Sequence, residues 1–157
     1  MMLLVKRCPL VMSALMFSLL FAGAEARAER INVEASGSVA EVTDALEAAV
    51  TAAGATVFAR VDHSAGAAGI GSELPPAELL IFGNPKLGTP AMQDNLLAGL
   101  YLPLKVLVYQ EADGRVFLVY DDPVATLTEL DGVTDDAVYL ARMRGALAAL
   151  TGKAAGR

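Results

Sequence analysis

An Asp-Gly pair, Asp113 and Gly114, separates two apolar segments in the second half of the chain, LKVLVYQE (104–111) and RVFLVYDD (115–122). Such a pair between strand-like segments is typical of a β-hairpin, because glycine readily takes the positive φ that the tight turn needs. The two strands of a hairpin are antiparallel neighbours. The pair therefore favours an α+β fold over a doubly wound parallel sheet.

The first half of the chain alternates between strand and helix patterns. Residues 30–36 (RINVEAS) alternate apolar and polar side chains, which is typical of a half-buried strand. Ser38 and Glu41 then form the capping-box pattern that begins a helix, and Gly54 follows the expected end of that helix. A second strand is predicted at 56–62 (TVFARVD), and it leads into a loop of small residues.

Four further elements complete the fold prediction. The segment AELLIF (77–82) is apolar at consecutive positions, as in a strand buried on both faces. Thr89 and Pro90 have the character of the N-cap and first residue of a short helix. A single helical turn is predicted at Pro123, and a last helix from about 134 to 150. The order β-α-β-β-α-β-β-α predicts a two-layer α+β sandwich, with a mainly antiparallel sheet and helices packed on one face.

The two hairpin strands carry apolar side chains on both of their faces. Leu107 and Tyr109 lie on one side of the first strand, and Phe117 and Val119 lie opposite the remaining apolar residues of the second. Helices cover one face, so the other meets a partner, a ligand or a second subunit, unless a loop and the last helix cover it. We expect a homodimer formed through a face or an edge of the sheet.

The N-terminal residues 1–28 have the three-part layout of a secretory signal peptide. Lys6 and Arg7 precede an apolar stretch, and small residues follow it, with cleavage expected after Ala24, Ala26 or Ala28. The alternative is a transmembrane anchor, which needs about 20 apolar residues, and this stretch is shorter. We therefore expect a periplasmic or secreted protein with no stable membrane anchor after processing.

Charge and cysteine content exclude several classes of function. Cys8, the single cysteine, lies ahead of the apolar stretch, so the processed chain would form no disulfide and no thiolate metal site. The net charge is −6 and the basic residues are scattered, which argues against nucleic acid as a partner. We expect one domain at residues 29–152, followed by a short tail at 153–157.

His63 is the only histidine, and it stands where the second predicted strand ends. It could be an inert residue held by hydrogen bonds. It is also the one side chain that changes charge near neutral pH, so it could act as a general acid or base or bind a ligand. No metal is assigned, and His63 is the only plausible nitrogen ligand for one. A Ser-His-Asp triad is not expected, because Asp62 points to the opposite face of the strand.

The loop FGNPKLGTP (82–90) follows the strand at 77–82 and contains a concentration of polar and turn-forming residues. It could serve only to turn the chain. However, a helix beginning at Thr89 would present free backbone N–H groups, and Lys86 would add a positive charge beside them. These groups, together with Asn84, favour an anion or a carbonyl oxygen. If the two strands before His63 and Asn84 were parallel, both segments would open on one edge and share a pocket.

The chain resembles a bacterial family, the domain of unknown function numbered 302. The resemblance rests on the strand ending at His63 and on IFGNPKLGTPAM (81–92), LPLKVLVYQEADG (102–114) and VYDDP (119–123), and it covers about residues 30–150. It implies a compact α+β fold, similar to TATA-binding-protein-like architectures and often dimeric. The family has no established general reaction. Its recurrent polar positions correspond to His63, Asn84, Lys86 and Thr89.

Three functions are compatible with these observations. The first is an exported domain that binds a small ligand or cofactor between His63 and the FGNPK loop. Haem is one candidate cofactor, with His63 as one axial ligand and Met92 as a second, although Met92 is more simply interpreted as a core residue of the short helix. The second is a hydrolase or lyase that uses His63 as general acid or base. The third is a dimeric protein-interaction module.

The signal-peptide prediction can be checked directly on the secreted protein. N-terminal sequencing of the soluble form should find a first residue between Glu25 and Glu29, because cleavage follows one of the three alanines at 24, 26 and 28. A membrane-retained form that still begins at Met1 would contradict it.

Overall fold

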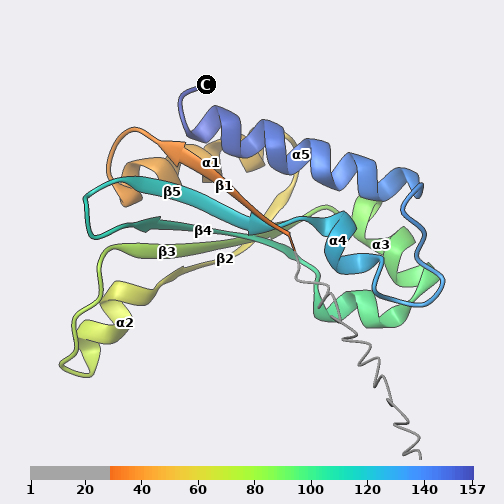
Figure 1. Cartoon of the computed structure of the whole chain (residues 1–157), viewed down its shortest axis with the longest axis horizontal. Helices are drawn as coiled ribbons and strands as arrows, with labels where there is room; N and C mark the ends of the chain where they lie inside the picture. Colours follow the sequence, from red (N-terminus) through yellow and green to blue (C-terminus); the bar gives the residue numbers. More distant parts are fainter. Residues whose placement is uncertain (1–28) are drawn as a thin grey trace, which may run out of the picture.

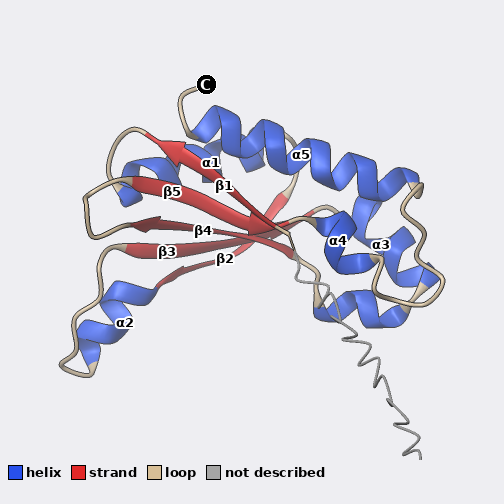
Figure 2. Ribbon diagram, in the orientation of Figure 1, coloured by secondary structure: helices blue, strands red, loops and turns tan. Residues whose placement is uncertain are grey.

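The computed structural model describes residues 29–157 as a five-stranded antiparallel sheet with helices on one face (Figures 1 and 2). The expected signal peptide lies outside the described residues. The spatial order of the strands is β1-β5-β4-β3-β2. The strands are β1 (Arg30–Ala35), β2 (Thr56–Asp62), β3 (Ala77–Gly83), β4 (Leu104–Gln110) and β5 (Val116–Asp121).

Helices connect these strands or follow them. Among residues 29–157, none of the helices has the length and apolar character needed to span a bilayer. The helices are α1 (Val39–Ala52), α2 (His63–Gly69), α3 (Pro85–Asp94), the 3-10 helix η1 (Leu96–Leu100), α4 (Pro123–Leu127) and α5 (Val138–Ala154).

The β4–β5 hairpin forms as the sequence predicts. Gly114 has φ +89° at the turn, and the Glu111 N–H donates to the Arg115 carbonyl over 2.9 Å. The predicted capping box also forms at the start of α1: the Glu41 carboxylate accepts from the Ser38 N–H, and the Ser38 hydroxyl accepts from the Glu41 N–H. The α+β class and the antiparallel sheet are confirmed.

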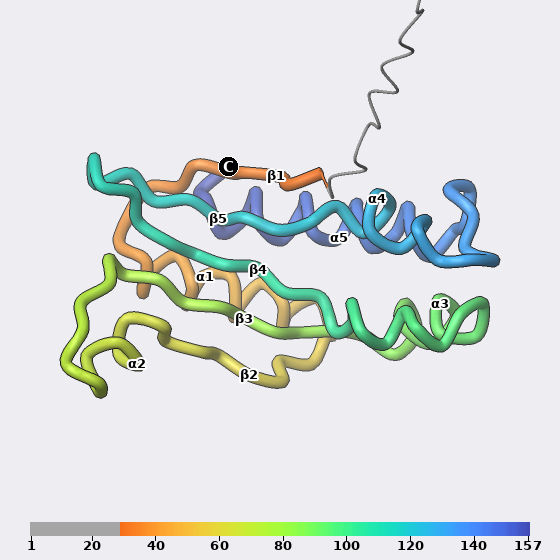
Figure 3. The backbone as a smooth tube through the Cα atoms, turned by 60° about the horizontal axis from the view of Figure 1, so that its bottom comes forward, coloured from red at the N-terminus to blue at the C-terminus, as the bar shows by residue number. Residues whose placement is uncertain are grey.

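Helices α1 and α5 pack side by side over one face of the sheet (Figure 1). Their apolar stripes meet the inward side chains of the central strands, among which Leu80, Val106 and Leu118 have no exposed surface. In Figure 3, turned by 60° from the view of Figure 1, the other surface of the sheet comes forward and both helices lie behind the strands. That second surface is called the open face below.

A second hydrophobic cluster lies beyond the end of the sheet, where α3, η1, α4 and the first half of α5 meet (Figure 1). Leu127, Leu140 and Met143 are almost fully buried there. The second half of α5, including Leu147, belongs instead to the cluster over the sheet. Helix α5 is therefore the element that joins the two clusters.

The structure corrects the prediction that the strand at 77–82 is buried on both faces. Leu80 and Phe82 are 0% and 2% exposed beneath the helices. Leu79 and Ile81 point to the open face and are only half-buried. The apolar run reflects a sheet whose second face is also rich in apolar side chains, and none of the helices within residues 29–157 covers that face.

Several helix bounds also differ from the prediction. The small residues after His63 form α2, because Asp62 caps that helix by accepting from the Ala65 N–H at 2.9 Å. The last helix runs from Val138 to Ala154, so it includes the first two residues of the expected tail at 153–157. Ala154 is buried against the sheet cluster.

An ion pair between a buried carboxylate and a half-exposed guanidinium fixes α5 to the end of β5. Asp122 is 4% exposed, and its carboxylate accepts from Arg144 Nε at 3.1 Å and Nη2 at 2.5 Å. The same carboxylate accepts from the Val124 N–H at 2.9 Å and so caps α4. The Asp122 side chain thus accepts hydrogen bonds both from the first turn of α4 and from the Arg144 guanidinium.

Asp122→Ala should lower the free energy of unfolding by about 2–4 kcal/mol. The change removes a helix cap and leaves the Arg144 guanidinium without its carboxylate partner. The matched control is Asp121→Ala, because Asp121 is exposed and makes only a surface ion pair with Arg30 at 3.6 Å. That control should cost less than about 1 kcal/mol in a denaturant titration. Equal losses for the two variants would contradict the assignment.

Candidate functional site

His63 and the FGNPK loop lie at opposite ends of the sheet, so the expected shared pocket does not form. Strands β2 and β3 are antiparallel, with Thr56 opposite Gly83 and Asp62 opposite Glu78. A strand rises about 3.3 Å per residue, so the length of β2 separates His63 from Asn84 by roughly 20 Å. The prediction depended on parallel pairing, and that pairing is absent.

His63 is exposed as the first residue of α2. Its neighbour Asp62 accepts hydrogen bonds from the Ala65 N–H and the Ser64 hydroxyl, and these bonds lower the pKa of Asp62. The hydrogen bonds around the histidine thus hold the start of the helix. They supply no enclosed environment for acid–base catalysis.

The FGNPK loop is shorter than the sequence suggested, because α3 begins at Pro85 and not at Pro90. Asn84 is the N-cap, and its Oδ1 accepts from the Lys86 N–H at 3.0 Å. Pro85 then takes the first helical position, which suits a residue without an N–H. Thr89 consequently lies inside the helix, and the anion site expected at its N–H group is absent.

A cavity of about 360 Å³ opens between this loop and the helical cluster. We call it the loop cavity. Asn84, Thr89 and Met92 line it, whereas Lys86 and His63 do not. Its other walls come from Phe58 of β2, residues 102–104 where the chain enters β4, and Met143 of α5. Segments distant in sequence therefore build one concave surface.

Glycines allow the walls of the loop cavity to approach closely. A Cβ at Gly83 would lie 3.4 Å from both Phe58 and Pro103, and one at Gly99 would lie 3.2 Å from the Met92 methyl group. Met92 is 37% exposed at the mouth, so it is not the core residue that the sequence allowed. Met143 is 1% exposed and closes the base. Both thioethers are polarizable and adaptable.

The positions of Met92 and His63 bear on the haem hypothesis. Met92 lies at the end of the sheet where β3 leads into α3, and His63 lies at the other end. At roughly 20 Å apart along the strand, the two side chains cannot ligate one iron. Within residues 29–157, no cluster of three or more His, Cys, Asp or Glu side chains is arranged to hold a metal ion.

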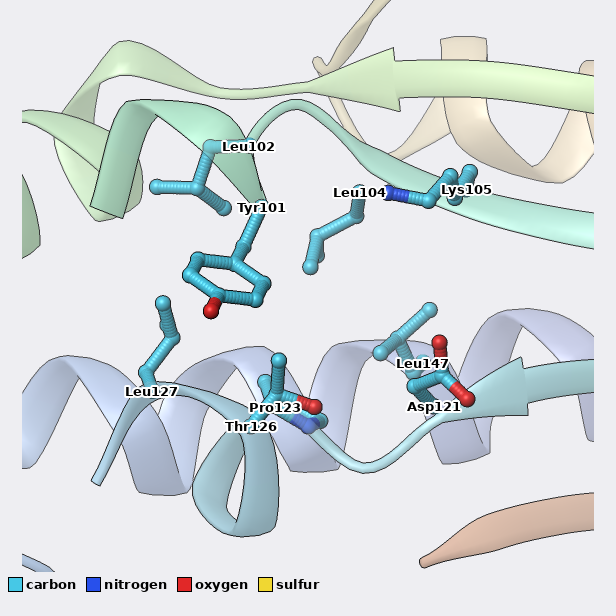
Figure 4. Close-up of a pocket in the computed structure, with 9 residues that line it drawn as sticks. All are labelled: Tyr101, Leu102, Leu104, Lys105, Asp121, Pro123, Thr126, Leu127 and Leu147. Carbon is cyan, nitrogen blue, oxygen red and sulfur yellow. The ribbon is translucent and has the colours of Figure 1, made fainter. Parts of the chain in front are cut away.

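Two smaller cavities lie nearby. One of about 40 Å³ sits between Tyr101, Leu104 and Leu127 (Figure 4), which is room for water alone. It shares Leu102 and Leu104 with the loop cavity. The other, about 160 Å³, is a hollow on the open face beside Lys105. Neither includes His63.

Comparison with known proteins identifies the family. The family model described as "Domain of unknown function DUF302" matches residues 31–150. The chain belongs to the DUF302 family. Its fold matches the crystal structure of an uncharacterized conserved DUF302 protein from Bacillus stearothermophilus, with a TM-score of 0.71 at 24% identity. That match covers 80% of this chain and 97% of the other, and it shows the fold alone.

Curated relatives of this DUF302 protein carry a different name. Fluoride-specific ion channel FluC 1 of Brucella suis is 46% identical over 93 residues, which are 59% of this chain and 37% of that protein. The FluC 1 protein of Brucella abortus gives the same identity over 34% of its length. The chain thus spans about a third of the curated relatives that it matches.

Sequence reasoning found part of the loop cavity and missed the rest. Asn84 and Thr89 stood out because they lie in an unusual loop. Phe58, Leu102 and Met143 carried no such signal, since an apolar residue in a strand or helix is most simply a core residue. Only the structure shows that Phe58 falls at an irregularity of β2 and is 58% exposed.

A hydrogen bond between α3 and α5 holds the walls of the loop cavity together in this DUF302 domain. The Tyr139 hydroxyl donates to Asp94 Oδ2 at 2.7 Å, and the two residues lie on the helices that carry Met143 and Met92. Burial, together with the bond to the carboxylate, raises the pKa of Tyr139 to about 12. The neutral phenol is therefore the form that the fold favours.

The contribution of Tyr139 to stability should disappear in alkali. Its pKa is about 12 in the folded state against 10.0 ordinarily, so the contribution is complete below pH 10 and is lost as the pH rises through 12. Denaturant titrations across this range should show the stability difference between wild type and Tyr139→Phe shrinking. Asp94→Asn should move the alkaline absorbance change of Tyr139 to lower pH. A stability difference between wild type and Tyr139→Phe that stays constant from pH 9 to pH 12 would contradict the assignment.

Proposed function

We propose that this DUF302 domain binds a small, largely apolar molecule without covalent chemistry, and that the loop cavity is its site. The observation that carries the proposal is the cavity itself, at about 360 Å³. Small-molecule sites in proteins are typically concave, mostly apolar and about 300–1,000 Å³ in volume. The proposal keeps the FGNPK loop as part of the site and removes His63 and Lys86 from it.

The chemistry of the walls supports an apolar ligand with one polar group. Phe58, Met92 and Met143 supply aromatic and thioether surface. The Asn84 amide is already engaged, since its Oδ1 accepts from Lys86 and its Nδ2 donates weakly to the Gly54 carbonyl at 3.5 Å. The exposed Thr89 hydroxyl remains to bind a carbonyl or hydroxyl group of the ligand.

The name of the Brucella relatives suggests fluoride as another ligand, and we do not extend it to this chain. A small anion taken out of water needs several donors to replace its hydration. The loop cavity offers mainly carbon and sulfur surface, and Lys86 lies outside it. The segment shared with those proteins is also a minor part of their length.

The proposed setting is the periplasm or the outside of the cell. Support for it comes from the layout of residues 1–28, with basic residues, an apolar stretch and small residues in that order. The absence of cysteine after Cys8 is compatible with that setting, because the domain would need no disulfide. The function proposed is therefore that of an exported binding domain.

Filling the loop cavity should abolish binding while the domain stays folded. Gly88 lines the cavity within α3, and a Cβ there would be in ordinary contact with Leu102 at 3.6 Å. Gly88→Leu should therefore extend into the cavity, and glycine replacement within a helix favours the helix by up to about 1 kcal/mol. The probe is N-phenylnaphthylamine, a neutral apolar fluorophore, titrated into the processed protein. Its affinity should fall at least about tenfold, the equivalent of 1.4 kcal/mol.

The matched control is Gly145→Leu. Gly145 lies on the exposed side of α5, and a Cβ there would contact nothing within 4 Å. This variant should bind the probe as wild type does, and circular dichroism and thermal midpoints should show all three proteins folded. Unchanged binding by Gly88→Leu would exclude the loop cavity as the site. Native mass spectrometry of protein purified from its own periplasm would then identify any retained molecule and the variant that loses it.

A further inference from the structure

Three cavities are neighbours at the end of the sheet where β4 begins. The loop cavity shares Leu102 and Leu104 with the cavity of about 40 Å³ shown in Figure 4. That smaller cavity, called the slot below, shares Lys105 and Asp121 with the hollow of about 160 Å³ on the open face. The slot therefore stands between the loop cavity and the open face, with a shared wall on each side.

The slot lies where β4 and β5 part. The ladder between these two strands ends at the pair of Leu107 and Val119. Beyond that pair, β4 continues beside β3, and β5 continues beside β1. Figure 4 shows Lys105 on one ribbon and Asp121 on the other, on opposite sides of the slot. The sheet is therefore split between its central strands at this end.

Backbone polar groups face the slot from both strands. The Glu111 N–H donates to the Arg115 carbonyl, and hydrogen-bonded pairs recur at every second residue of an antiparallel ladder. Lys105 and Asp121 have the register of such a pair, but the ladder ends two residues before them. Their N–H and carbonyl groups therefore point toward each other across the slot without bonding to each other. The slot thus offers hydrogen-bond donors and acceptors to a third group.

The charged side chains around the slot and the hollow favour an anion. Lys105 and Arg30 are exposed cations, and Asp121 is the one carboxylate among the residues that line these two cavities. Asp121 already pairs with Arg30 at 3.6 Å. Lys105 takes part in none of the ion pairs within residues 29–157. One positive charge is therefore left over beside the slot.

We propose that the ligand of this DUF302 domain is an amphiphilic carboxylate, with its apolar body in the loop cavity and its carboxylate group in the slot. The inference rests on the proposed function, because the loop cavity has to hold the body. The backbone N–H groups of Lys105 and Asp121 donate to the carboxylate oxygens, and the Lys105 ammonium adds its charge from the open face. Hydrogen bonds to an ionised acceptor are about twice as strong as those between neutral groups.

The sizes of the two cavities fit such a ligand. By itself the slot has room only for water, and about 40 Å³ corresponds to about three molecules. A carboxylate group has the same number of non-hydrogen atoms and would take the place of that water. The body reaches the slot between Leu102 and Leu104, which are half-buried, when one of these side chains turns to another rotamer. The Thr89 hydroxyl stays available for a second, uncharged polar group of the ligand.

The first experiment compares two ligands of equal chain length that differ in charge. Decanoate and decanol, each below the concentration at which it aggregates, are titrated at neutral pH against N-phenylnaphthylamine bound to the processed protein. Decanoate should displace this probe at a concentration at least about fivefold lower than decanol, because only the carboxylate forms charge-assisted hydrogen bonds in the slot.

The outcomes separate this inference from the proposed function. If the probe binds but decanoate displaces it no better than decanol does, the carboxylate site is wrong and the loop cavity stands. If the probe, decanoate and decanol all fail to bind, the proposed function is wrong and the inference falls with it.

Lysine variants locate the carboxylate. Lys105→Met should weaken decanoate binding about fivefold and leave the affinities for decanol and the probe unchanged, because only decanoate carries a charge. The matched control is Lys86→Met, which removes the same charge from a residue that lines neither the loop cavity nor the slot, and it should leave all three affinities unchanged. The reverse result would place the carboxylate beside the FGNPK loop and overturn the inference.

Amide resonances of the wild-type protein give a second readout, which stays informative if Lys105→Met fails to fold. Decanoate should shift the N–H resonances of Lys105 and Asp121 more than that of Val106, and decanol should not. The Val106 N–H is the internal reference because it faces β3, as the bond from the Gln110 N–H to the Pro76 carbonyl in that ladder indicates. Equal shifts at Lys105 and Val106 would show that the carboxylate lies outside the slot.

Discussion

The packing of α5 across two hydrophobic clusters is the constraint on which the rest of the structure depends. Its second half covers the sheet beside α1, and its first half covers α3, η1 and α4 beyond the sheet's end. Arg144, in the middle of the helix, is held by the buried carboxylate of Asp122. Without this one helix, the two clusters would share little besides the links that leave β3 and enter β4.

The loop cavity follows from the way those clusters meet. The sheet packs tightly under α1 and α5, and the helical cluster packs tightly around Leu127 and Leu140. Between them the chain leaves β3 through Gly83 and enters β4 after Pro103, and the backbones of these links approach closely. The space that remains is bounded by Met92 and Met143, one on each helix of the Tyr139–Asp94 bond. The loop cavity therefore lies where the two hydrophobic clusters meet, and not inside either cluster.

The open face has a related origin, because both long helices lie on the same side of the sheet (Figure 3). An antiparallel sheet tolerates one solvated face when that face is polar. Here the central strands carry apolar side chains outward as well, at Leu107, Phe117 and Val119. The homodimer expected through a face or an edge of the sheet stays a prediction.

The sequence by itself determined the features that depend on contacts within a few residues. The Asp113-Gly114 turn and the Ser38–Glu41 capping box formed as predicted, because their hydrogen bonds close locally. The predicted start of α3 at Pro90 is wrong, because the helix begins at Pro85. Proline is favoured at the first position of a helix, and both prolines meet that condition. The direction of β2 relative to β3 was beyond local reasoning. Residues 63–76 are long enough for either a crossover or a return.

Only the tertiary structure decided that this connection returns at the same end, through α2. That single choice separates His63 from the FGNPK loop by the length of a strand. It also brings Phe58, from the start of β2, to the loop cavity in its place. Strand direction is fixed by how the whole sheet buries its inward face against α1 and α5. That burial depends on the assembled fold and cannot be read from any short segment.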